Sequence, residues 1–425
     1  MHFLKTQIGK GIVLKGMGIL SLWVGMQCQA QIGTSETLPI AEIDSLIVKN
    51  SPLHGANVPA DIRFRLGAAH VAGKYTLTTS PFLLEGSEAI HNLGMGTIKL
   101  WFQDDPARDY PYHSDWNLSK EASLVDIAMH PYFKQVFDMP FQTFALSVRS
   151  EVSLQHAMSG SVTNYAEEEE AMYQLANYLL ETYRDRQVVF ILQNWEGDWL
   201  MRGGTGAEAQ WTPASIPADI EKRSEVMINW FNARQAGVNR ARLAAGQTNC
   251  KVYHAIEVNR VLDCRKGIPC LTSNILPYVK TDMVSWSCYD GLADPVDLWL
   301  GIDCIQAHMR PTGEFPTVPI LIGEVGIPEN EGSVFGIASN NGEILKEELI
   351  KRWDQAMAVF LARDIPYIIH WEVYCNEVKS GVQSSSEYTK DQMRGFWLIR
   401  PDGTESYAAS YLRSLLENAG RSIKK

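Results

Sequence analysis

Two glutamates in this chain each follow closely on a run of apolar residues. Glu196 comes after the run 188–192, and Glu324 comes after the run 318–322. Short apolar runs rich in β-branched side chains are typical of strands that are buried on both faces in a parallel sheet. A carboxylate is costly at the end of a buried strand unless it is paired or used, and parallel α/β folds carry out their chemistry at that end. Glu196 and Glu324 are therefore the candidate catalytic groups.

A pair of carboxyl groups that face each other across a sugar is what glycoside hydrolysis requires. One carboxyl acts as the acid, and the other acts as the nucleophile or as the base that activates water. One must keep its proton near neutral pH while the other stays ionised, and burial and hydrogen bonding can arrange that difference. The simpler roles for Glu196 are a cap on the next helix or an ion pair with Arg202. A second glutamate at an equivalent strand end favours the catalytic interpretation.

The elements that would position these two groups alternate along the chain between strand-like runs and helical patterns. The expected strands are 63–70, 96–102, 141–148, 188–192, 251–258, 283–289, 318–324 and 366–373. The expected helices are 81–93, 120–137, 166–184, 219–245, 295–308, 342–363 and 406–418. Eight strands in this alternation predict a single α/β domain of the (β/α)8 TIM-barrel type. A doubly wound sheet is the rival, but no glycine-rich phosphate-binding pattern follows any of the strands.

Five short segments resemble the clan A glycoside hydrolases, which are retaining (β/α)8 enzymes. They are 193–196 at the fourth strand, 322–324 at the seventh, 370–371 at the eighth, 285–289 at the sixth, and the late segment 395–403. The resemblance covers roughly residues 60–420, and the order and spacing of the segments carry it. It does not identify a family within the clan.

The resemblance implies a role for several residues. Glu196 would be the acid/base, Glu324 the nucleophile and Trp371 a platform for the sugar, and the Tyr289 hydroxyl would bond to the nucleophile. The clan normally has an asparagine immediately before the acid, whereas Trp195 stands between Asn194 and Glu196 here.

Positions i and i+2 share one face of a strand, so Asn194 and Glu196 could still both reach the substrate. Glu257, at the end of the fifth expected strand, and Asp198 are alternatives for the acid. No cofactor and no metal are implied by the resemblance.

Other side chains at strand ends or in the following loops are candidates for binding a sugar. Indole rings stack on the apolar faces of sugar rings, although packing in the core is the alternative for each of them. The candidate indoles are Trp101, Trp116, Trp195, Trp199, Trp211 and Trp371. Lys99 is either a basic group beside the nucleophile or a buried lysine paired with an acid. His70 is either a substrate contact or a histidine packed in the barrel.

The first 30 residues have the pattern of a secretory signal. A basic start is followed by an apolar stretch over 16–26 and by a small-residue cleavage pattern at 28–30. Cys28 could instead carry a lipid anchor, although the residue before it fits a lipobox poorly. No apolar run is long enough to span a bilayer comfortably. We therefore expect a secreted or periplasmic protein without a membrane-spanning segment.

After the signal we expect a leader over 31–60 that packs against the first strand, and then a catalytic barrel over 61–425. The signal holds three lysines and no acidic residue, so its removal would change the net charge from −11 to −11 − 3 = −14. Such a charge argues against nucleic acid or an anionic membrane as the main partner. An even number of cysteines in an exported chain predicts disulfide bonds, and Cys264–Cys270, which bracket a short loop, are the expected pair.

The sequence therefore predicts a retaining glycosidase that acts on a poly- or oligosaccharide. A second interpretation is a carbohydrate-binding protein without activity on a glycosidase-derived barrel, but the presence of both carboxylates counts against it. A third is a metal-dependent hydrolase. The residues available for that chemistry are His70, Asp104, His254 and His370, and they show no spacing of the HExxH kind.

Overall fold

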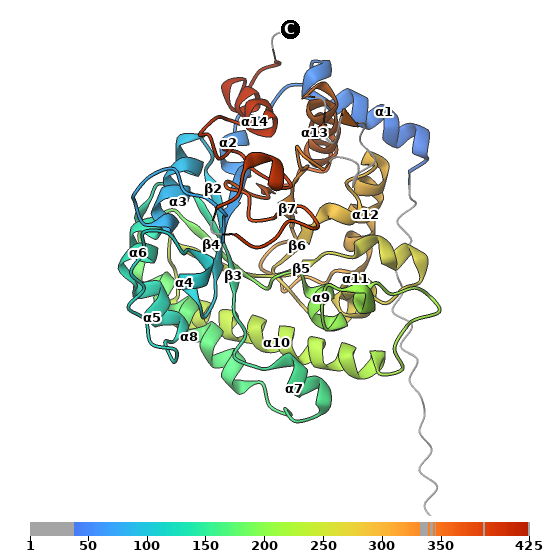
Figure 1. Ribbon diagram of the computed structural model, residues 1–425. Helices are drawn as coiled ribbons and strands as arrows, with labels where there is room; N and C mark the ends of the chain where they lie inside the picture. The colour runs from blue at the N-terminus through green and yellow to red at the C-terminus, as the bar shows by residue number, and fades with distance from the viewer. Residues whose placement is uncertain (1–37, 332–338, 341–342, 345, 386, 424–425) are drawn as a thin grey trace, which may run out of the picture. The chain divides into compact units, whose positions relative to one another are not determined.

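Eight parallel strands close into a barrel with helices around it, so the predicted (β/α)8 fold is confirmed (Figure 1). The computed structural model describes residues 38–331, 339–340, 343–344, 346–385 and 387–423. The barrel strands are β1 (Leu66–His70), β2 (Thr97–Phe102), β3 (Thr143–Val148), β4 (Val189–Gln193), β5 (Lys251–Val258), β6 (Met283–Ser287), β7 (Ile320–Val325) and β10 (Ile368–His370). A separate antiparallel pair, β8 (Ser339–Asn340) and β9 (Glu343–Ile344), lies outside the barrel sheet.

Each strand pairs with its neighbours in sequence order, and β10 closes the barrel between β7 and β1. The register is regular except around β7. There Ile322 pairs with Trp286 of β6, but the next pair joins Glu324 to Ser287, and the register against β10 shifts in the same place. A bulge at this point re-aims the side chains that follow it. Glu324 is one of them.

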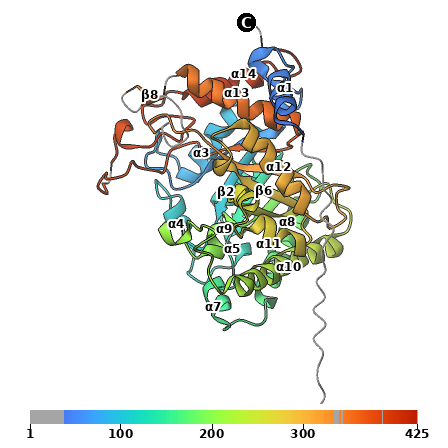
Figure 2. The same ribbon diagram turned by 90° about the vertical axis from the view of Figure 1, so that its right-hand side faces the viewer.

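The helices cover the outside of the barrel (Figures 1 and 2). The long ones are α3 (Phe82–Asn92), α8 (Ala166–Thr182), α10 (Ile220–Ala245), α12 (Pro295–His308), α13 (Lys346–Ala362) and α14 (Tyr407–Glu417). The helix expected over 120–137 is divided into α5 (Leu124–Met129) and α6 (Pro131–Asp138). Proline fixes φ and lacks an N–H, so Pro131 begins a new helix instead of continuing the first.

The short elements are α2 (Ile62–Arg65), α4 (Pro106–Asp109), α7 (Leu154–Ser159), α9 (Gly197–Arg202), α11 (Leu271–Asn274) and the 3-10 turns η1 (Pro52–His54), η2 (Ala207–Ala209), η3 (Val261–Lys266), η4 (Leu276–Tyr278), η5 (Cys288–Asp290) and η7 (Lys390–Gln392). Between β5 and β6 the chain has only such short pieces instead of one long helix. The first strand is also shorter than expected, because residues 62–65 form α2.

The described part of the leader, 38–60, contains the helix α1 (Ile40–Asn50) and the turn η1. The buried residues of α1, Ile43 and Ile47, are four positions apart and so share one helix face. That face packs against α13 and α12. The expectation that the leader packs against the first strand is therefore wrong. An amphipathic helix can cover other helices as well as a strand, and the sequence did not distinguish these partners.

The acidic start of α8 includes one buried carboxylate. Glu168 is buried and forms an ion pair of 2.5 Å with Arg234 of α10. Glu168 also accepts hydrogen bonds from the Ser150 hydroxyl and the Glu151 N–H. It therefore links α8, α10 and the loop after β3.

The expected signal over 1–30, with Cys28, lies outside the described residues, as do residues 31–37 of the leader. Among the helices that the structure describes, none combines the length and the apolar character needed to cross a bilayer.

Candidate active site

A cavity of about 780 Å³ opens among the loops that follow the carboxyl ends of the strands. Glu196 and Glu324 both line it. The remaining wall is formed by Trp101, Trp195, Trp199, Thr205, Asn259, Arg260, Tyr289, Asp290, Ala293, Trp371, Asn376, Glu377, Arg394 and Phe396. The fold thus brings the two predicted catalytic carboxyls to one cavity from strands on different sides of the barrel.

Glu324 lies within β7 and is held on both carboxylate oxygens. Its Oε1 accepts a hydrogen bond of 2.8 Å from the Lys99 ammonium group, and its Oε2 accepts one of 3.4 Å from the Tyr289 hydroxyl. Only 3% of the Glu324 surface is exposed. Burial raises the pKa of this carboxyl to about 7, and the charge of Lys99 opposes that rise. Lys99 therefore favours the ionised form that a nucleophile needs.

Glu196 lies beyond the end of β4, at the residue before α9. Its backbone has φ 25°, a left-handed conformation that is rare for a residue with a side chain. Its N–H donates a hydrogen bond of 3.0 Å to Oε1 of Glu257. Burial raises the pKa of the Glu196 carboxyl well above its usual range, and the charges of Glu324 and Glu257 add to the rise. Glu196 is therefore the carboxyl that keeps its proton, as a general acid must.

A buried charge cluster beneath the cavity connects the two glutamates. Glu257 is fully buried, and its Oε2 accepts hydrogen bonds from Lys99 at 2.8 Å, Gln193 at 2.5 Å and Ser285 at 3.0 Å. Lys99 is also fully buried and bonds to both Glu257 and Glu324. The other oxygen of Glu257 accepts a hydrogen bond from the Glu196 N–H, so this one side chain contacts both Glu196 and Lys99, which in turn holds Glu324.

The cluster depends on a glycine in β7. A Cβ atom added at Gly323 would lie 1.9 Å from the Ser285 hydroxyl oxygen and 2.5 Å from Oε2 of Glu257. No side chain fits there without displacing the buried carboxylate. The glycine before Glu324 is therefore required by packing inside the barrel.

The Asn194 side chain does not line the main cavity, as a residue that contacts the sugar would have to. Its Oδ1 accepts a bond of 2.8 Å from the Glu257 N–H, and its Nδ2 donates a bond of 3.0 Å to the Glu257 carbonyl. It lines a smaller neighbouring pocket of about 260 Å³ instead of the main cavity. The rule that i and i+2 share a face fails because β4 ends at Gln193 and Glu196 has a positive φ. The side chain clamps β5 to the end of β4.

The two alternatives for the acid are not on the cavity wall. Glu257 belongs to the cluster beneath it. Asp198 is fully buried, and its carboxylate accepts bonds from the backbone N–H groups of Asn259, Arg260 and Leu271. Asp198 therefore fixes the loop after β5, and among the three acidic candidates Glu196 alone lines the cavity.

Of the six candidate indoles, four line the main cavity: Trp101, Trp195, Trp199 and Trp371. Trp371 follows β10 and donates its indole N–H to Oε1 of Glu377 at 3.1 Å. Glu377 in turn pairs with Arg394. Trp116 packs instead against His130, and Trp211 lies beneath the guanidinium group of Arg202. Four of the six candidates therefore line the cavity, and the other two pack against neighbouring side chains.

His70 is placed as a barrel histidine. It is buried, its Nε2 lies 2.7 Å from the Phe82 carbonyl oxygen, and its ring fills the space above Gly86 of α3. Burial lowers the pKa of this imidazole to about 4, which keeps it neutral. It does not line the main cavity, and the structure therefore does not support the alternative role of His70 as a substrate contact.

Several wall residues were not identified from the sequence. Asn259, Arg260, Asn376, Glu377 and Arg394 all belong to irregular loops that have no periodic pattern. Three of them are charged: Arg394 pairs with Glu377, and Arg260 pairs with Asp263. For Asn259, Arg260, Asn376 and Glu377 the only signal was their nearness in sequence to the ends of β5 and β10, and Arg394 lies far beyond β10.

The expected Cys264–Cys270 bridge is not found. The Cys264 sulfur lies 2.6 Å from the Cys304 sulfur, while the buried Cys270 thiol lies 3.4 Å from the Ser273 hydroxyl oxygen. The short loop between positions 264 and 270 includes the last residues of η3, which turn Cys264 toward α12. The cysteine whose sulfur lies beside that of Cys264 is therefore distant in sequence.

No protein-family model matches this chain, and no curated protein matches it. Solved structures that can be superposed on it include a GH5_18 protein from Bifidobacterium longum subsp. infantis, at 13% identity over 84% of this chain and 79% of that one, with a TM-score of 0.48. A Bacteroidetes-affiliated GH5 cellulase gives 13% identity, 85% and 94% coverage and a TM-score of 0.47. A GH2 β-galacturonidase from Eisenbergiella tayi gives 11% identity, 84% and 51% coverage and a TM-score of 0.46.

The chain spans about half the length of that β-galacturonidase and of two β-glucuronidases that it also matches. These structures belong to the glycoside hydrolases, the class that the sequence resembles, and no family within it is identified. The barrel itself is established by the strand pairing of this chain.

Proposed function

We propose that this protein is a retaining glycosidase that acts on a poly- or oligosaccharide. The observation that carries the proposal is the pairing of Glu196 and Glu324 on one cavity wall in unlike surroundings. Among the described residues Glu196 forms no ion pair, and burial together with the charges of Glu324 and Glu257 favours its protonated form. Glu324 is bonded to Lys99, which favours its carboxylate form. Glycoside hydrolysis needs this combination of an acid and an anion.

In the first step, Glu324 attacks the anomeric carbon while Glu196 gives its proton to the departing glycosidic oxygen. In the second step, Glu196 takes a proton from water, and that water releases the sugar from Glu324. The contacts of Lys99 and Tyr289 fix both oxygens of Glu324, which suits a nucleophile whose orientation must be set before attack. Four indoles around the cavity suit the apolar faces of sugar rings.

The test is an assay of the full chain on a panel of aryl glycosides and polysaccharides, with the product anomer followed by proton NMR during the first minutes of turnover. The expected result is hydrolysis that releases the sugar in its original anomeric configuration. Inverted product would contradict the double displacement. Binding of oligosaccharides without any turnover would favour the carbohydrate-binding interpretation instead. Glu324→Ala is the control that separates enzymatic from contaminating activity.

Export remains part of the proposal. It rests on the basic, apolar and small-residue pattern over 1–30. Edman sequencing of protein recovered from the exporting cell should begin at position 31. A mature chain that begins with a lipid-modified residue 28 would favour the anchored alternative, and a chain that keeps residues 1–30 would exclude both.

A further inference from the structure

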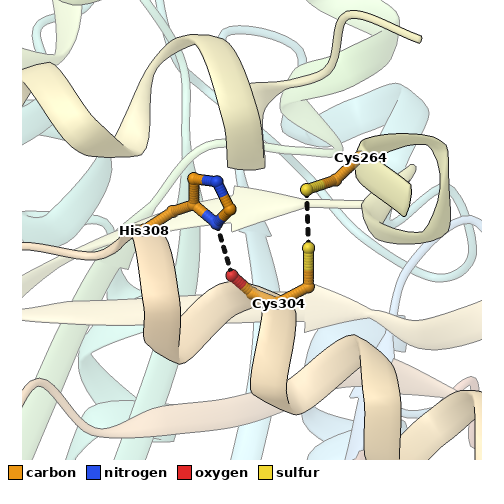
Figure 3. Close-up of side chains that lie close together, drawn as sticks. All are labelled: Cys264, Cys304 and His308. Carbon is orange, nitrogen blue, oxygen red and sulfur yellow. Dashed lines mark hydrogen bonds between the residues drawn. The ribbon is translucent and has the colours of Figure 1, made fainter. Parts of the chain in front are cut away.

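We propose that Cys264 and Cys304 form a disulfide bond that fastens together the loops after β5 and β6. The inference does not depend on the glycosidase proposal. Figure 3 shows the two sulfur atoms pointing toward each other, one from η3 and one from α12. They are 2.6 Å apart, and a small movement closes the S–S bond of about 2.05 Å. Among the described cysteines, this is the pair whose sulfurs are in contact.

Exposure also separates this pair from the other described cysteines. Cys264 and Cys304 are both partly exposed, whereas Cys250, Cys270, Cys288 and Cys375 are buried. A disulfide donor has to reach the thiol that it oxidises. The two cysteines whose sulfurs touch are therefore also the two described cysteines that are partly exposed.

The surroundings favour Cys264 as the attacking thiol. The Cys304 thiol donates to it, and Arg265 adds positive charge, so the pKa of Cys264 is lowered from its ordinary value. The Cys264 thiolate would attack one sulfur of a donor disulfide and release a thiol. Cys304 would then lose its proton, attack the Cys264 sulfur and release the second donor thiol. Two cysteine thiols are oxidised by two electrons, and the donor disulfide is reduced to two thiols.

A metal site is the competing use of these residues, because a ring nitrogen of His308 lies within 4.8 Å of both sulfurs. Two thiolates on one zinc ion at about 2.3 Å each stand roughly 3.7 Å apart in tetrahedral geometry. The observed sulfur separation of 2.6 Å is too short for that arrangement. The Nδ1 atom of His308 is also bonded to the Cys304 carbonyl at 2.7 Å (Figure 3). The geometry therefore favours the bridge.

The bridge would join segments 40 positions apart that carry part of the cavity wall. Asn259 and Arg260 precede η3, and Tyr289 and Asp290 precede α12. The two loops already share one hydrogen bond of 2.8 Å, from the Leu262 N–H to the Asp290 carboxylate. A covalent link across the same gap would restrict the separation of these loops in the unfolded and partly unfolded chain.

The test is a peptide map of the full chain after incubation of the native protein with oxidised glutathione. The protein is denatured, its free thiols are alkylated without reductant, and it is digested with trypsin. Cleavage separates Cys264, in 261–265, from Cys270, in 267–280, and leaves Cys304 in 281–346 with Cys288. The expected map links 261–265 to 281–346 and shows alkylated Cys270. Cys304→Ser should abolish the link, whereas Cys288→Ser should keep it.

Three results would overturn the proposal. They are alkylation of both Cys264 and Cys304, a link between 261–265 and 267–280, and one equivalent of bound zinc whose removal frees both thiols. A thermal measurement adds an independent readout. Reductant should lower the Tm of the wild-type chain by on the order of 5 °C and leave the Tm of Cys264→Ser/Cys304→Ser unchanged. An equal response of both proteins to reductant would contradict the bridge.

Discussion

The ends of β4 and β7 each place a glutamate in one cavity, but the backbone conformation and the supporting contacts of the two glutamates differ. Glu324 remains inside its strand, and a register shift against both neighbouring strands aims it. Glu196 has left its strand and takes a left-handed backbone conformation. Glu324 is held through its own carboxylate by Lys99, whereas Glu196 is held through its backbone N–H by Glu257.

The difference matches what each group has to do. A nucleophile must stay ionised and point in one direction, so direct bonds to its oxygens help. An acid/base must gain and lose a proton in each cycle, so a support on the backbone leaves its carboxyl free. One buried residue, Glu257, supports both strand ends, because it accepts hydrogen bonds from Lys99, which holds Glu324, and from the Glu196 N–H.

The largest expected effects come from removing either carboxyl, and they should differ in kind. Glu324→Ala should abolish turnover on every substrate, because the nucleophile acts in the first step. Glu196→Ala should lose about 10²–10⁴-fold on natural sugars and much less on aryl glycosides whose leaving group departs without protonation. Rates on a series of leaving groups measure this, and added azide should give inverted product with Glu324→Ala and retained product with Glu196→Ala.

Glu257→Ala is the comparison variant for this experiment. If it shows the leaving-group dependence and Glu196→Ala does not, then the acid lies on β5 and the two strand ends have been assigned incorrectly. Circular dichroism of each variant is needed beside the rates, because Glu257 is fully buried and its loss leaves Lys99 with one partner fewer.

The next effect in size concerns Lys99, which is bonded to Glu324 and not to Glu196. Its charge lowers the pKa of both carboxyls. Lys99→Met should therefore raise both pKa values and move the pH profile of kcat/KM toward higher pH. The acidic limb, which reports ionisation of Glu324, should move further than the alkaline limb. At a pH below the acidic limb the loss should be about tenfold or more. A shift of both limbs toward lower pH would contradict the ion pair.

A smaller effect in the opposite direction is expected from Glu257→Gln. The charge of Glu257 raises the pKa of both Glu196 and Glu324. The neutral amide should lower both values and move the whole profile toward lower pH. If Glu257 also orients Glu196 through its backbone, kcat should fall at every pH while KM changes little. If the limbs of the pH profile stay in place and only the Tm of the variant falls, Glu257 has a structural role and does not tune the two carboxyls.

The sequence was sufficient for the parts of this comparison that depend on local pattern. Apolar runs of strand length identified the eight barrel strands, and their polar ends identified Glu196 and Glu324. The exchange of bonds between Asn194 and the Glu257 backbone joins residues 63 positions apart, and nothing in either local pattern indicates it. The positive φ of Glu196 was equally hidden, because a strand rule was applied to residues that lie beyond the strand.

The cysteines illustrate the same limit. Nearness in sequence favoured Cys264–Cys270, but the sulfurs that touch are brought together by the packing of η3 against α12. Loop residues such as Glu377 and Arg394 also reach the cavity only through the arrangement of chain after β10. Contacts of this kind follow from which elements are neighbours in the closed barrel, and local spacing does not contain that information.

The smallest effect should come from the aromatic donors, one at each strand end. The Tyr289 hydroxyl bonds to Glu324 at 3.4 Å, and the Trp199 side chain beside Glu196 lowers the pKa of that carboxyl. A single hydrogen bond contributes about 0.5–1.5 kcal/mol, so Tyr289→Phe should lower kcat by roughly 3–10-fold. Trp199→Phe should leave the acidic limb in place and move the alkaline limb toward higher pH, since Glu196 would hold its proton more tightly. If the two variants gave the same change, the nucleophile and the acid/base could not be told apart by their supports. The different geometry of β4 and β7 requires two distinct changes. Tyr289→Phe should change kcat, and Trp199→Phe should move the alkaline limb of the pH profile.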